Sequence, residues 1–196
     1  MTTKGSYRRS ITGRASGLMF TCALLVGPAM GAASATSDLP AATPAQWHTQ
    51  KIEFTYVGYT ALYTCDGLES KVRAILLTFG ARKDAKVRSI GCDRAQNQPN
   101  KVAWVEAEFS TLAPASSATT ASDTVQGVWA KVQLAPNRPT DMGMGECELV
   151  EQMRPMIEKA FALRNTDYQT TCVPKQISVA DYRVKTEVLQ LRPIAY

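Results

Sequence analysis

Residues 65–92, CDGLESKVRAILLTFGARKDAKVRSIGC, decide the fold because they place a helix, a turn and a strand between two cysteines. Apolar residues recur at helical spacing through the first part, which predicts an amphipathic helix over residues 66–79. Gly80 is a natural end for that helix, since glycine readily adopts the left-handed conformation required there. A short strand is expected at residues 87–90, just before Cys92.

A second stretch, residues 147–172, repeats this order with the sequence CELVEQMRPMIEKAFALRNTDYQTTC. The first cysteines of the two stretches are 82 positions apart and the second cysteines 80 positions apart. The inward-facing residues of the strands that follow, such as Val105 and Thr186, align at a shift of 81. These offsets predict a tandem duplication of a β-α-β-β unit.

Alternating apolar and polar residues mark the remaining strands, which are expected at 52–56, 101–109, 125–134 and 182–191. Two β-α-β-β halves can share one sheet with both helices packed on the same face. The predicted fold class is therefore α+β, with a mainly antiparallel sheet, two helices on one face and two disulfides.

Four cysteines remain once a leader peptide is set aside, and four cysteines allow three pairings. The repeat favours Cys65 with Cys92 and Cys147 with Cys172. Each bridge then closes a loop of about 25 residues, which on the chain-entropy model stabilises the fold by about 3 to 4 kcal/mol.

The chain opens with the pattern of an export signal. Residues 1–14 are basic with no acidic residue, residues 18–30 are apolar, and residues 33–35 form a small-x-small cleavage site. We expect a signal peptide over residues 1–35, read by either the general or the twin-arginine pathway. The apolar run is too short to predict a membrane span, so none is expected after cleavage.

The basic character of the sequence belongs to this leader. It holds four of the 22 basic residues and none of the 17 acidic ones, so the rest of the chain carries 18 against 17, a net charge of about +1. Nucleic-acid binding needs a basic stripe on the folded domain, and none is visible, which excludes a nucleic-acid partner.

The domain organisation follows from composition. Residues 36–50 contain prolines and no periodicity, and predict a flexible arm in which His48 is solvated. A single α+β domain is expected over residues 51–196. It divides into a first half (51–111), a mobile linker rich in alanine, serine and threonine (112–123) and a second half (124–196).

The candidate binding surface lies on the sheet face opposite the helices. Trp104, Glu106 and Glu108 alternate with the inward residues of their strand, and Trp129 does the same on another strand. Aromatic side chains on an open sheet face are suited to contact with a protein or a glycan.

We therefore expect an exported bacterial envelope protein, periplasmic or secreted, that acts as a non-enzymatic binding module for an envelope protein or glycan. The alternative is a small secreted hydrolase that uses carboxylates such as Glu106, Glu108 or Asp66. No catalytic residue, metal ligand or cofactor site is predicted, because the cysteines are expected to be oxidised and His48 has no second histidine beside it.

Overall fold

The computed structural model describes residues 41–192 apart from 93–97, 117–120, 174 and 178–179. The expected leader, residues 1–35, lies outside the described residues. The described part of the chain is an α+β domain with six strands, two α-helices and two single-turn 3₁₀ helices. In chain order these elements are β1 (Thr43–Val57), α1 (Cys65–Thr78), β2 (Lys86–Ile90), β3 (Val102–Pro114), η1 (Ala121–Asp123), β4 (Val125–Leu134), η2 (Met144–Glu146), α2 (Cys147–Ala160), β5 (Leu163–Thr170) and β6 (Tyr182–Leu191).

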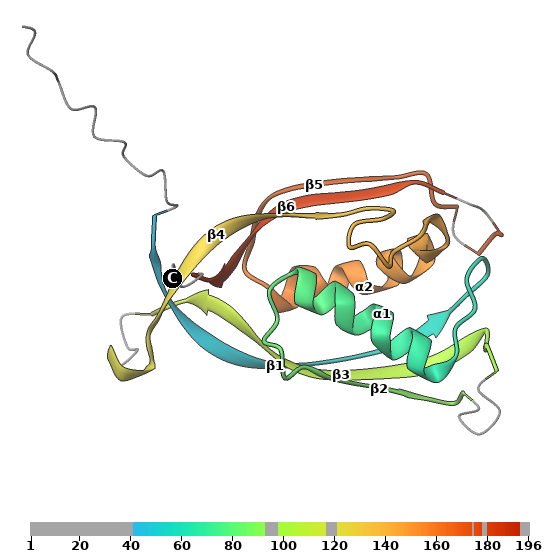
Figure 1. Cartoon of the computed structure of the whole chain (residues 1–196), viewed down its shortest axis with the longest axis horizontal. Helices are drawn as coiled ribbons and strands as arrows, with labels where there is room; N and C mark the ends of the chain where they lie inside the picture. The colour runs from blue at the N-terminus through green and yellow to red at the C-terminus, as the bar shows by residue number, and fades with distance from the viewer. Residues whose placement is uncertain (1–40, 93–97, 117–120, 174, 178–179, 193–196) are drawn as a thin grey trace, which may run out of the picture. The chain divides into compact units, whose positions relative to one another are not determined.

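All six strands form one antiparallel sheet in the order β2-β3-β1-β4-β6-β5. The sheet has a narrow join in its middle, because β1 pairs with β3 from Ala45 to Val57 but with β4 only from Thr43 to Ala45. We call β1, β2 and β3 the first half-sheet, and β4, β5 and β6 the second half-sheet. Beyond the join the two half-sheets separate, and both helices lie between them (Figure 1).

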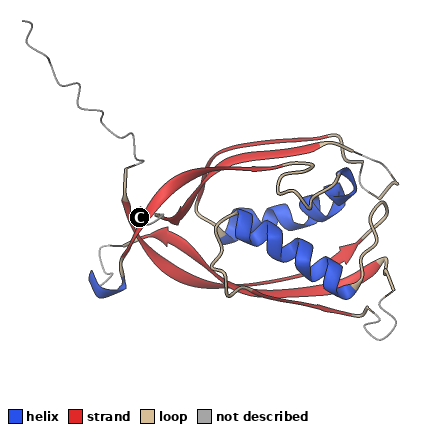
Figure 2. Ribbon diagram, viewed as in Figure 1, coloured by secondary structure: helices blue, strands red, loops and turns tan. Residues whose placement is uncertain are grey.

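The order of elements repeats in the two halves. Each half runs strand, helix, strand, strand, and in each the last of these strands lies between the other two. Figure 2 shows the helices enclosed by strands of both half-sheets, so they share the inner face of a bent sheet. The origin of this repetition by gene duplication stays a prediction.

Each helix packs into the core through a face of apolar residues that recur at helical spacing. The side-chain oxygen of Thr64 accepts a hydrogen bond from the backbone N–H of Gly67 at 3.1 Å, which caps the start of α1. Near the join, the ring of Phe161 lies 5.8 Å from that of Phe79 and 5.6 Å from that of Phe109. The core also contains buried strand residues, and the helices contribute to it Leu68, Val72, Ile75, Leu76, Leu149, Val150, Met153 and Ile157.

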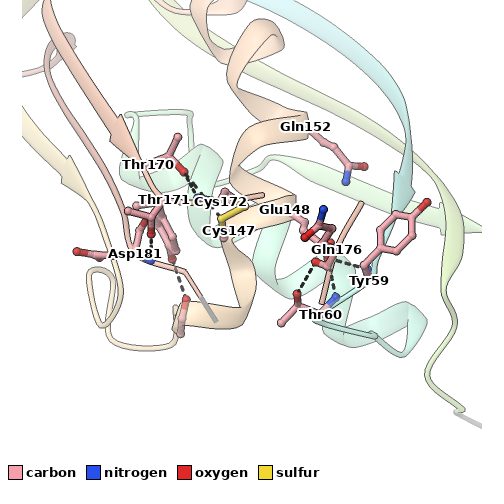
Figure 3. Close-up of a disulfide and its surroundings, with 12 residues drawn as sticks. Tyr59, Thr60, Cys147, Glu148, Gln152, Thr170, Thr171, Cys172, Gln176 and Asp181 are labelled. Carbon is pink, nitrogen blue, oxygen red and sulfur yellow. Dashed lines mark hydrogen bonds between the residues drawn. A yellow bond between two sulfur atoms is a disulfide. The ribbon is translucent and has the colours of Figure 1, made fainter. Parts of the chain in front are cut away.

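The expected disulfides are confirmed. Cys65 is bonded to Cys92 and Cys147 to Cys172. In each pair the first cysteine is the first residue of a helix, so both bridges lie at helix N-termini. Figure 3 shows the second bridge joining the start of α2 to the segment that follows β5.

Two expected boundaries are wrong. The arm expected at residues 36–50 is strand from Thr43 onward, because β3 and β4 supply hydrogen-bonding partners for it. The linker expected at residues 112–123 begins too early, since β3 continues to Pro114 and Leu112 is buried. Leu112, Ala45 and Leu189 form a small second core beside the join, separate from the core around the helices.

Candidate functional site

The outer face of the first half-sheet carries three of the four residues singled out from the sequence. Directly paired residues of an antiparallel sheet point to the same side, and so do residues two apart on one strand. On this basis Trp104, Glu106 and Glu108 share one face with residues of β1 and β2. We call this surface the outer face; its members are Lys51, Glu53, Thr55, Lys86, Arg88, Ile90, Val102, Trp104, Glu106 and Glu108.

One end of the outer face is apolar and exposed. Trp104 is 45% exposed, and its cross-strand neighbour Ile90 is 51% exposed. Val102, two residues before Trp104 on the same strand, is 49% exposed. Isolated exposed apolar residues are common on protein surfaces, whereas a contiguous group indicates contact with a partner.

The middle of the outer face is an ion-pair network. The Nζ atom of Lys51 lies 2.8 Å from a carboxylate oxygen of Glu53 and 2.7 Å from one of Glu106. The hydrogen bond from Lys51, together with its charge, lowers the pKa of Glu106 below its usual range. Glu106 is therefore ionised at neutral pH, and the same contacts raise the pKa of Lys51.

Glu108 lies one pair further along, beside Lys86 of β2 and Lys51 of β1. Glu106, Glu108 and three basic residues line a hollow of about 590 Å³. A general acid needs a raised pKa, so the lowered pKa of Glu106 does not suit the acid role in glycoside hydrolysis. This hollow is suited to salt-bridging contacts with a partner.

The fourth residue, Trp129, lies elsewhere. It belongs to β4 and packs against the small core of Ala45, Leu112 and Leu189. Arg164 covers its ring, with the guanidinium carbon 4.3 Å from the ring centroid. On β1, Thr43 pairs with β4 at the join, whereas Thr55 pairs with Trp104. These two positions are 12 residues apart, which is about 40 Å along the strand. Trp104 and Trp129 therefore do not form one small binding surface.

Sequence reasoning missed a polar contact between α2 and the end of β1. Glu148 is only 5% exposed, and its Oε2 atom accepts hydrogen bonds from the backbone N–H groups of Tyr59 at 2.7 Å and Thr60 at 2.9 Å (Figure 3). One turn later, the amide of Gln152 both donates to and accepts from the backbone of Val57, each at 3.0 Å. The only sequence signal was the four-residue spacing of Glu148 and Gln152, which places them on one side of the helix.

The other chemical candidates remain apart from one another. His48 and Asp66 are both exposed, the first on β1 and the second in the first turn of α1. The four cysteines among the described residues are joined in two disulfides, so none of them is a thiol nucleophile. Within the described residues, no three histidine, cysteine or carboxylate side chains lie close enough to hold a metal ion. No helix in this part of the chain has the length and apolar character needed to span a membrane.

Comparison with known proteins finds no matching family model, curated protein or solved structure.

Proposed function

We propose that this chain is an exported protein of the bacterial cell envelope that binds another protein through the outer face and performs no catalysis. The observation that carries this proposal is the contiguous exposed group of Ile90, Val102 and Trp104 beside a network of charged side chains. Protein interfaces commonly have this arrangement, in which an apolar centre containing an aromatic anchor is bordered by polar residues.

Export is supported by the leader pattern and by the cysteines. Disulfides form and persist in oxidising compartments, and the chain has two of them. The basic n-region, the apolar run and the cleavage site of residues 1–35 follow the pattern of a secretory signal. We therefore place the protein in the periplasm or outside the cell.

A carboxylate-dependent hydrolase is the second candidate, because Glu106 and Glu108 line the same hollow. Catalysis by two carboxylates requires one of them to be protonated when the substrate binds. Lys51 holds Glu106 in its ionised form, so a hydrolase would have to use Glu106 as the base or nucleophile and Glu108 as the acid. If the protein hydrolyses a glycan, and if Glu106→Gln and Glu108→Gln each abolish that hydrolysis, the hydrolase becomes the favoured function.

The test is recovery of partners from an envelope extract by the purified, oxidised protein. Trp104→Ala removes the aromatic anchor and should reduce recovery of a specific protein by about tenfold or more. Leu191→Ala is the matched control, because Leu191 is 51% exposed, close to the 45% of Trp104, but lies on the second half-sheet. Equal recovery by the parent and by Trp104→Ala would refute the outer face as the binding surface, and recovery of glycan alone would refute a protein partner.

A further inference from the structure

A cavity of about 380 Å³ lies between the start of α2 and the end of β1, and none of the ten outer-face residues named above lines it. Tyr59 and Val57 border it on one side, Glu148, Glu151 and Gln152 on another, and the Cys147–Cys172 bridge contributes Cys172. This volume is within the range of small-ligand sites, which are typically about 300 to 1,000 Å³. The cavity can hold a small molecule or a single long side chain.

One carboxylate oxygen at this cavity has no partner. Oε2 of Glu148 receives two backbone N–H groups, but Oε1 is buried and accepts no hydrogen bond from the described residues. The adjacent amide of Gln152 is bonded to the backbone of Val57 at both ends and makes no hydrogen bond to Oε1. Buried polar atoms are nearly always hydrogen-bonded, so Oε1 is an acceptor available to a donor from outside the chain.

The charge and polarity of the lining identify that donor. Glu148 and Glu151 give two negative charges, against the single positive charge of Lys175, so the lining has a net charge of −1. The remaining lining includes Val57, Tyr59 and the half-buried Cys172, and it is mainly apolar. A ligand that fits has a positively charged hydrogen-bond donor at one end and an apolar body.

We propose that this cavity binds a primary ammonium group on an apolar stem, with Oε1 of Glu148 accepting from the ammonium. A charge-assisted hydrogen bond of this kind is stronger than a neutral one, and an apolar wall excludes competing water. A lysine side chain of a partner protein and a free alkylamine have the same chemistry, and both fit this description. Glu151 adds the second negative charge, whereas the positive charge of Lys175 repels the ammonium.

Calorimetric titration of the purified, oxidised protein with three six-carbon probes tests the site. Hexylammonium should bind saturably, whereas hexanol and hexanoate should bind about tenfold more weakly or not at all. Glu148→Gln should weaken hexylammonium binding by about tenfold, because it removes the charge but keeps an oxygen for the two backbone N–H groups. Glu158→Gln is the matched control, since Glu158 is on the same helix but does not line the cavity.

Two further measurements sharpen the result. Lys175→Ala should leave hexylammonium binding unchanged or tighter; weaker binding of hexylammonium, or preferential binding of hexanoate by the parent, would overturn the proposal. Circular dichroism and the urea midpoint of Glu148→Gln show whether that variant is folded, and a folded variant with parental affinity also overturns it. Lysine capped as Nα-acetyl-lysine methylamide distinguishes the two sources: tighter binding than hexylammonium indicates a protein lysine, and weaker binding indicates a free amine.

Discussion

Trp104 is exposed on the outer face of the first half-sheet, whereas Trp129 of the second half-sheet is covered by Arg164 and packs against the small core at the join. The interior of the two halves is much more alike than their surfaces. Each helix starts at a bridged cysteine, and Phe79 and Phe161, which directly follow the two helices, are in ring contact. The comparison indicates that the frame of disulfides, helices and core is common to both halves, whereas the surface proposed to bind a partner belongs to the first half alone.

The ends of the helices show the same parallel in more detail. The hydroxyl of Thr111 on β3 donates to the carbonyl of Ala160, the last residue of α2, at 2.9 Å. The amide of Gln190 on β6 donates to the carbonyl of Thr78, the last residue of α1, at 3.2 Å. Each helix is therefore tied at its C-terminus to the central strand of the opposite half-sheet.

The largest effect is expected from removing the disulfides one pair at a time. The bridges span similar sequence separations, 27 and 25 residues. Cys65→Ala with Cys92→Ala, and Cys147→Ala with Cys172→Ala, should each lower the free energy of unfolding by about 3 to 4 kcal/mol. Urea unfolding monitored by circular dichroism measures both losses. A difference of more than about 1 kcal/mol between the two double variants would contradict the equivalence of the halves.

A smaller and unequal effect is expected at the helix ends. Thr111→Val keeps the shape of a buried side chain but leaves the carbonyl of Ala160 without its donor, which should cost about 1 to 3 kcal/mol. Gln190→Met removes the equivalent donor in the second half, where the side chain is only half-buried and water can replace it. Its cost should be below about 1 kcal/mol. Equal losses of unfolding free energy would show that burial does not distinguish the two contacts.

The sequence predicted features that depend on spacing within the chain. Regular offsets identified the bridge between Cys65 and Cys92 and its counterpart, and alternation identified the inward residues of β3 and β6. The start of β1 was missed because Pro44 and its alanine neighbours show no alternation and become strand only by pairing with β3 and β4. Local propensity is a weak guide where such long-range pairing decides the structure.

The candidate site shows the same limit. Trp104 and Glu106 were placed correctly on one face, since residues two apart on a strand always share a side. The same alternation places Trp129 on one side of β4. Its ring is covered by Arg164 only because β5, which carries Arg164, lies on the other side of β6 from β4, an order that the sequence pattern does not give. In the sequence, Glu148 is an acidic residue near a helix start, a pattern that is typical of an exposed position. In the structure it is buried and bonded to backbone N–H groups of a loop about 90 residues earlier in the chain, which the sequence pattern could not show.

The smallest effect concerns pH, and it compares one carboxylate from each half. The hydrogen bond from Lys51 lowers the pKa of Glu106, and the one from Arg164 lowers the pKa of Glu187. A lowered pKa in the folded state contributes stability that is present above the unfolded-state pKa and is lost as pH falls through the folded-state pKa. Glu106→Gln and Glu187→Gln should therefore reduce stability slightly at neutral pH and approach the parent as pH falls below the unfolded-state pKa of about 4.3, which flattens the acid side of the stability curve. Urea unfolding over this pH range measures the effect, with Glu108→Gln as control because Glu108 forms no ion pair with the described residues. Both ion pairs are partly exposed to solvent, so the two effects should be similar and should decrease with added salt. Variant curves parallel to the parent's would show that these ion pairs do not contribute to stability in either half.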